Sequence, residues 1–157
     1  MFIIKQKVNS IFFLFLIFLV PFLLYSNESG GLALHGGYAF ETSKKQKNAA
    51  LYISFFNNSN KDIFINSFST KVANKTELHD VKVENDIVKM FPLQDIKIKA
   101  KSELFLQPGG KHIMLFDLNR KLNDKEDFTL NVHLKDGRVL KTKIMILSKE
   151  LRKNFLN

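Results

Sequence analysis

The sequence predicts a small all-β protein, a sandwich or barrel built from short strands. Runs of β-branched and aromatic residues recur roughly every 8–12 residues from Ala49 onward, with polar or glycine-containing turns between them. Several runs alternate apolar and polar residues, the periodicity of a half-buried strand. No long segment has helical periodicity, apart from the C-terminal tail SKELRKNFLN. The 157 residues fit a single domain.

The first expected strands lie in the N-terminal half of this domain. AALYISFF is a strand that ends in the polar turn NNSNKD. In IFINSFST, we expect Ile63, Ile65 and Ser67 on one face and Phe64 and Phe68 on the other. TELHDVKVENDIVKM is expected to form two strands around the turn END.

The remaining strands follow in the C-terminal half. DIKIKAKSELFLQPGG alternates over Ile96 and Ile98 and resumes at Leu104 and Leu106. The segment Pro108–Gly110 predicts a tight turn, because Pro fixes one φ angle and Gly permits a positive one. HIMLFDL, FTLNVHL and RVLKTKIMIL are further strands, the last two joined by a Lys-Asp-Gly hairpin turn.

The N-terminus has the features of a targeting signal. Lys5 and Lys7 precede an apolar run of about 15 residues from Ile11 to Tyr25, which is short for the ~20 residues of a membrane span. We expect residues 1–26 to be a signal peptide or an uncleaved N-terminal anchor. Either one predicts export, in a bacterium to the periplasm, with contact to the membrane only through this segment.

The chain therefore divides into four expected parts. After the signal or anchor come a flexible lead-in (27–37), the β-sandwich domain (38–147) and a C-terminal tail (148–157).

Composition excludes several functions. The chain has no cysteine, so it offers no disulfide, no thiolate nucleophile and no thiolate metal ligand. Its formal net charge is +9, but the lysines are scattered and no nucleic-acid-binding motif occurs, so we expect no nucleic-acid partner. No nucleophile motif, zinc-protease motif or phosphate-binding loop is present, and we expect no enzymatic activity.

The scarce His and Met residues indicate a different chemistry. His112 and Met114 are two residues apart in an expected strand, so their side chains share a face. With His79 and Met90 they would form a set of two imidazoles and two thioethers, which suits the soft ion Cu(I) and does not suit Ca²⁺ or Mg²⁺. The residues alone leave the alternatives open, because a lone Met is an ordinary core gap-filler and a lone His an ordinary strand residue.

The other His and Met residues fit that set less well. We expect His133 to be a solvent-facing strand residue and Met145 to be a core residue, while His35 falls in the lead-in.

The spacing of the four residues resembles the motif of the periplasmic copper chaperones called PCu(A)C. That motif, H-x(10)-M-x(21)-H-x-M, matches at His79, Met90, His112 and Met114. The flanking segments TELHD, VKMFPLQDIKIKAKSELFLQPGGKHIML and ALYISFFNNSNKD are also similar to the family. The similarity runs from about residue 38 to residue 147. It departs at Tyr38, where the family often has Trp and continues with an Arg and a Pro that this chain lacks.

This resemblance implies a cupredoxin-like Greek-key β-sandwich that binds Cu(I) through the four matched residues. It also implies delivery of copper toward the copper sites of a respiratory haem–copper oxidase. The implied partners are the copper ion, the copper-accepting subunit of cytochrome c oxidase and, as a second protein candidate, a thiol-bearing copper assembly protein. The alternative is an exported structural or interaction β-sandwich module that holds no metal.

Overall fold

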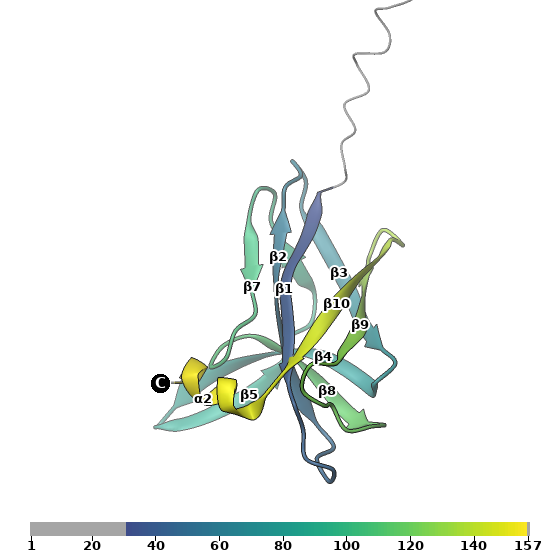
Figure 1. The fold of residues 1–157 in the computed structure, drawn as a ribbon. Coiled ribbons are helices and arrows are strands. Elements are labelled where there is room, and N and C mark those ends of the chain that lie inside the picture. Colours follow the sequence, from purple (N-terminus) through teal and green to yellow (C-terminus); the bar gives the residue numbers. More distant parts are fainter. Residues whose placement is uncertain (1–30, 157) are drawn as a thin grey trace, which may run out of the picture.

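The computed structural model describes residues 31–156, which form ten strands and a short C-terminal helix (Figure 1). The expected signal or anchor at residues 1–26 lies outside the described residues. Within residues 31–156, no helix has both the length and the apolar character needed to cross a membrane. The elements are β1 (Leu32–Phe40), β2 (Ala49–Asn57), β3 (Ile63–Thr70), β4 (Ala73–Glu84), β5 (Ile87–Pro92), β6 (Ile96–Ile98), β7 (Glu103–Phe105), β8 (His112–Leu118), β9 (Asp127–Leu134), β10 (Val139–Leu147) and α2 (Lys149–Leu156).

The strands pair in the order β5-β4-β8-β2-β1-β10-β9-β3-β6, with β7 paired separately to β2. Apart from β1 and β10, which run parallel, the neighbours are antiparallel. Neighbours such as β8 and β2 are not consecutive in sequence, so the chain crosses over between distant parts of the sheet, as in a Greek-key topology. The prediction of an all-β Greek-key sandwich is confirmed.

The core lies between the two halves of the folded sheet. Phe55 of β2 and Phe68 of β3 are separated by three strands in the pairing order, yet their ring centroids are 6.2 Å apart. Strand β2 shows the underlying pattern, since buried and half-buried residues alternate along its whole length. Leu51, Ile53 and Phe55 are its core residues. The alternation leaves a second face of each strand free for other contacts.

The hairpin turns have the backbone geometry that their sequences predict. Asn85 and Asp86, between β4 and β5, have φ angles of 51° and 60°, as a type I′ turn requires. Gly137 joins β9 to β10 with a φ of 88°, and Gly109 has a φ of 79° in the turn before β8. Of these turns, the one at Asn85 and Asp86 and the one at Gly109 adjoin β4, β5 and β8, the strands that carry the candidate ligands.

The expected flexible lead-in (27–37) differs from the structure, because residues 32–37 belong to β1. This segment pairs with β2 in antiparallel orientation, and β1 continues alongside β10. Gly37 is buried against Ile144, where a Cβ atom would lie 2.4 Å from the Ile144 side chain. The glycine therefore serves close packing here.

The expected face of Ser67 is also wrong. The register of β3 against β9 shifts between Ile65 and Ser67, the mark of a β-bulge. Beyond the bulge, Phe68 is buried and Ser67 is exposed. One inserted residue reverses the alternation, and the large apolar ring takes the core position.

We predict that Ile113→Ala lowers the free energy of unfolding by about 2–5 kcal/mol, because it leaves a cavity behind the β8 strand. Ile113 has no exposed surface and pairs with both Leu51 and Leu78. Chemical denaturation followed by circular dichroism would measure the change, with exposed Lys141→Ala as the control. An Ile113→Ala value equal to that of the control would contradict this account of the core.

Candidate metal site

The structure places the four predicted ligands on one face of three adjacent strands. Strand β4 lies between β5 and β8. His79 of β4 pairs directly with His112 of β8, and Met114 follows two residues later on the same strand. Met90 of β5 pairs with Val81, which is two residues after His79. Directly paired residues and residues two apart share a face of the sheet, so the four side chains project from the same side.

The opposite face of these strands belongs to the core. Leu78, Ile113 and Leu115 alternate with the candidate ligands and are buried. Their burial fixes which face the His and Met side chains take, because a register slip of one residue would move those polar groups into the core.

The two imidazoles are the buried part of the set. His79 is 9% exposed and His112 is 6% exposed. Their ring centroids are 6.1 Å apart, and the ring planes are inclined by 30°. Phe116 lies 5.8 Å from His79, and Tyr52 lies 6.4 Å from His112, both measured between ring centroids. The imidazoles therefore sit in an aromatic surround with little access to water.

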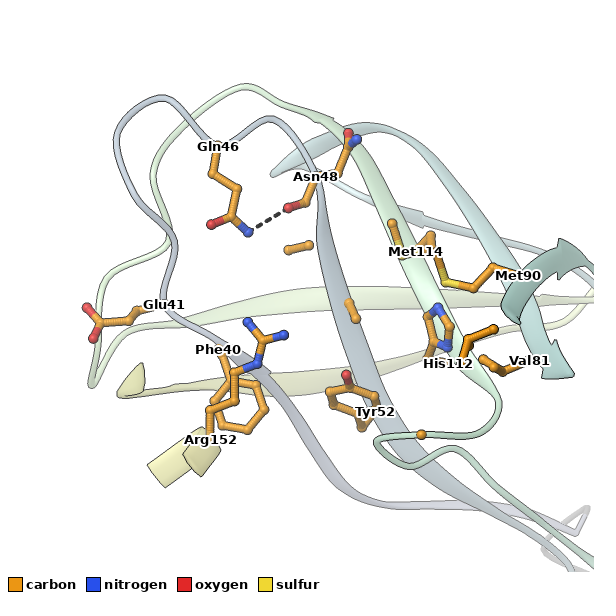
Figure 2. A pocket seen from close by; sticks show the side chains of 14 residues that line it. Phe40, Glu41, Gln46, Asn48, Tyr52, Val81, Met90, His112, Met114 and Arg152 are labelled. Atoms are coloured by element: carbon orange, nitrogen blue, oxygen red, sulfur yellow. Dashed lines mark hydrogen bonds between the residues drawn. The ribbon is translucent and has the colours of Figure 1, made fainter. Parts of the chain in front are cut away.

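The two thioethers are more open. Met90, on β5, is 56% exposed, whereas Met114 is half-buried. Both line a pocket of about 470 Å³ together with His112. Figure 2 shows the Met90 and Met114 side chains gathered beside the His112 ring at one end of this pocket. Three of the four predicted ligands thus border one cavity, and His79 borders His112 from the neighbouring strand.

Hydrogen bonds orient both imidazoles. The Nδ1 atom of His112 donates to the carbonyl oxygen of Gly110 at 2.8 Å, which leaves Nε2 with its lone pair. The Nε2 atom of His79 lies 3.1 Å from Oε2 of Glu77. The Nδ1 atom of His79 is buried, and no described residue forms a hydrogen bond with it. An unpartnered buried nitrogen in a group of soft donors fits a place for a metal ion.

Two ionisable groups next to the imidazoles have shifted pKa values. The ammonium group of Lys75 and, second, the His79 ring hold the pKa of Glu77 below its usual value through hydrogen bonds. Burial raises the pKa of the Tyr52 phenol, and the nearby Arg152 cation partly offsets this. At neutral pH, Glu77 is therefore a carboxylate and Tyr52 is a neutral phenol.

The far end of the pocket has a different character. Phe40, Glu41 and Arg152 line it, and Figure 2 shows the Arg152 guanidinium directed into the cavity. Within the described chain, Arg152 forms no ion pair with a carboxylate. Helix α2 thus supplies a positive charge opposite the neutral thioethers.

The other His and Met residues lie elsewhere. His35 is exposed on β1 with its ring against Phe56. His133 is half-buried on β9, with Nε2 2.8 Å from the Ser69 hydroxyl. Met145 was expected in the core but is 55% exposed, because its neighbours Ile144 and Ile146 take the inward positions on β10.

Sequence reasoning did not single out Glu77 or Tyr52. A signal for Glu77 was present, because it stands two residues before His79 and so shares its face. Tyr52 reaches the site through the pairing of β2 with β8, which only the three-dimensional structure reveals.

The fold and the single His–Met face define a small cupredoxin-like β-sandwich with a candidate soft-metal site. The chain belongs to the LpqE-like family, whose model, described as "Putative lipoprotein LpqE-like", matches residues 32–146. No curated protein sequence matches the chain.

Solved structures of PCuAC domains share this fold. The copper-bound PCuAC domain from PmoF2 superposes with a TM-score of 0.64 at 12% identity, covering 76% of this chain and 94% of that domain. The apo PCuAC domain from PmoF1 gives a TM-score of 0.63 at 17% identity, covering 76% and 95%. The Cu(I) form of DR1885 from Deinococcus radiodurans, solved in solution, gives 0.60 at 23% identity, covering 79% and 84%. At these identities the likeness establishes the fold.

We predict that Gly109→Ala lowers the free energy of unfolding by about 1–2 kcal/mol, because alanine is strained at a φ of 79°. Gly110→Ala is the matched control, since its added Cβ would meet only Gln107 atoms at an ordinary 3.7 Å. Thermal or chemical denaturation of both variants measures the difference. Equal stability of the two variants would contradict a strained turn before His112.

Proposed function

We propose that this protein is an exported carrier that binds one Cu(I) ion through His79, Met90, His112 and Met114. The observation that carries the proposal is the convergence of two imidazoles and two thioethers on one face of the sheet, beside one pocket. Neutral nitrogen and sulfur donors suit Cu(I), and no carboxylate in this set would favour a hard cation. The shared fold with the copper-bound PmoF2 domain supports the same proposal.

The donor set fits a carrier better than an enzyme. Four protein donors complete the coordination of Cu(I) and leave no position for a substrate. The chain has no cysteine thiolate that would hold copper more strongly or form a blue-copper electron-transfer site. Met90 is more than half exposed at the edge of the sheet, so one donor can be replaced from outside. We therefore propose transport and release of copper as the role of the site.

We propose that the copper-accepting subunit of cytochrome c oxidase, a respiratory haem–copper oxidase, receives the copper, in keeping with the resemblance to the PCu(A)C chaperones. A thiol-bearing copper assembly protein is the second candidate partner. Export through residues 1–26 would place the carrier in the periplasm. The family description names a lipoprotein, and we propose that residues 1–26 provide any membrane attachment of this chain.

A metal-free interaction module is the alternative function. The β4–β5 hairpin favours it, because Val83, Ile87 and Val88 are exposed at its tip. Exposed apolar side chains gathered on one element are a common mark of a protein-binding surface. The two functions differ in whether the chain needs copper, and a binding measurement separates them.

We predict that residues 31–157 bind one Cu(I) ion per chain under anaerobic conditions. Met90→Ala and His112→Ala should each weaken binding at least about ten-fold, because each removes a donor atom. Competition against a chromophoric Cu(I) chelator measures the affinity. Met145→Ala is the matched control, since Met145 is 55% exposed and Met90 is 56% exposed.

Two results would contradict this prediction. Absence of bound copper in the unaltered chain would favour the metal-free module. Equal losses in Met145→Ala and Met90→Ala would show that thioethers bind copper without the proposed geometry.

We predict that a bacterial host that naturally carries this protein assembles less copper-loaded cytochrome c oxidase after its gene is deleted. The full chain should restore the copper content, whereas a chain without residues 1–26 should not, because it would stay in the cytoplasm. Copper analysis of the purified oxidase, together with cell fractionation, gives the measurement. Full restoration by the Met90→Ala variant would argue against copper delivery through this site.

A further inference from the structure

The two candidate imidazoles differ in which ring nitrogen is already in use. We propose that they bind copper through different atoms, His112 through Nε2 and His79 through Nδ1, with Glu77 as the positioning residue for His79. This inference rests on the proposed function, because it concerns the same Cu(I) site. It adds a residue outside the H-x(10)-M-x(21)-H-x-M set and an asymmetry that the motif does not contain.

In His112, a hydrogen bond to the backbone determines which ring nitrogen carries the proton. Its Nδ1 atom lies 2.8 Å from the Gly110 carbonyl oxygen, which can only accept a hydrogen bond. Nδ1 therefore carries the proton in the neutral ring, and Nε2 carries the lone pair. Gly110 belongs to the turn that precedes β8, so this hydrogen bond links the His112 ring to the turn at the beginning of its own strand.

In His79, a hydrogen bond to a side chain places the proton on the other ring nitrogen, Nε2. Its Nε2 atom lies 3.1 Å from Oε2 of Glu77, and a carboxylate only accepts. Nε2 then carries the proton, and the lone pair lies on Nδ1. That Nδ1 atom is buried, and it has no hydrogen-bond partner within the described chain. Buried nitrogens are almost always paired, so an unpaired lone pair in this cluster is explained if copper is its partner.

Glu77 is itself held in place. Its second oxygen, Oε1, forms an ion pair with the Lys75 Nζ atom at 2.7 Å. Both carboxylate oxygens therefore have a partner, Lys75 for Oε1 and His79 for Oε2. Glu77 also pairs across the strands with Met114, which puts it at the flank of the metal site. A histidine that binds a metal commonly donates its other N–H to a carboxylate, which fixes the ring and makes the metal-binding nitrogen more basic. Glu77 has this relation to His79.

The same contacts permit one competing arrangement. Glu77 could occupy the copper-binding atom of His79 only in the metal-free protein and leave when copper arrives. Copper would then replace the Glu77 contact at Nε2, and both imidazoles would bind through the same type of atom. The unpartnered Nδ1 favours the first arrangement, and spectroscopy distinguishes the two.

Long-range ¹H–¹⁵N correlation spectra of ¹⁵N-labelled protein test the proposal, since Cu(I) is diamagnetic. The metal-free protein should show His79 with its proton on Nε2 and His112 with its proton on Nδ1. On loading with Cu(I), the ¹⁵N resonances that shift should be Nδ1 of His79 and Nε2 of His112. A His79→Gln variant assigns the His79 signals.

Variants of Glu77 test its positioning role. Glu77→Ala should remove the single proton position of His79 and weaken Cu(I) binding about 10–100-fold, the range typical of lost partners of metal-binding histidines. Glu77→Gln keeps an acceptor oxygen and should restore both the spectrum and most of the affinity. Glu84→Ala is the control, because Glu84 pairs with Lys82 and Lys89 away from the imidazoles.

The outcomes separate this inference from the function on which it rests. Failure of the unaltered chain to bind Cu(I) would overturn both. Copper bound with shifts at Nε2 of both imidazoles would overturn the asymmetry and leave the carrier function standing. An unchanged His79 spectrum in Glu77→Ala would overturn the role of Glu77 alone.

Discussion

The register of three adjacent strands is the constraint on which the rest of this structure depends. Strands β5, β4 and β8 pair so that His79 stands opposite His112 and Val81 stands opposite Met90. Because side chains alternate between faces, the same register sends Leu78 and Ile113 into the core. The same strand register therefore determines both the packing of the core and the placement of the candidate ligands. Burial of the apolar face stabilises the fold, and the same register brings the four candidate side chains to the other face.

This arrangement has an electrostatic consequence. Two imidazoles at 9% and 6% exposure would be costly if their polar atoms were unmatched. Two of the four ring nitrogens have a hydrogen-bond partner, Nδ1 of His112 and Nε2 of His79, and the buried Nδ1 of His79 has none within the described chain. The donors in the proposed set are all neutral, so a bound monovalent ion would introduce a single positive charge. The Glu77 carboxylate beside His79 would partly balance that charge.

Much of this fold could be predicted from the sequence. Strict alternation in AALYISFFN and turn sequences such as END and KDG located β2, β4, β5, β9 and β10, because each signal is local. The start of β1 and the bulge in β3 could not be predicted from such local signals. Gly36 and Gly37 indicate flexibility in isolation, yet Gly37 gives β1 its close contact with Ile144, a residue more than 100 positions later. The bulge in β3 depends on the fit of Phe68 against Phe55 in the core, which is again a long-range contact.

The candidate site was predictable to the same extent. Spacing within β8 placed His112 and Met114 on one face, and the family resemblance added His79 and Met90. Strand pairing then brought these residues to one side of the sheet, while their role as copper ligands stays a prediction. Tyr52 and Arg152 reach the pocket through pairing and helix placement that no local pattern records. Met145 is a residue for which the local pattern misleads, because its apolar character predicts burial and its register makes it exposed.

Exposure differs across the four proposed donors in a way that fits exchange of the ion. His79 and His112 are buried, Met114 is half-buried and Met90 is 56% exposed. Within the described chain, β5 pairs only with β4, so Met90 lies in the outermost strand of the sheet. Under the proposed function, a receiving protein would bring its own donor to the ion before release, and Met90 would be the donor displaced first because it is the most exposed of the four. The buried imidazoles would then hold the ion until the transfer is complete, so a stable site and an exchangeable one can coexist in the same four residues.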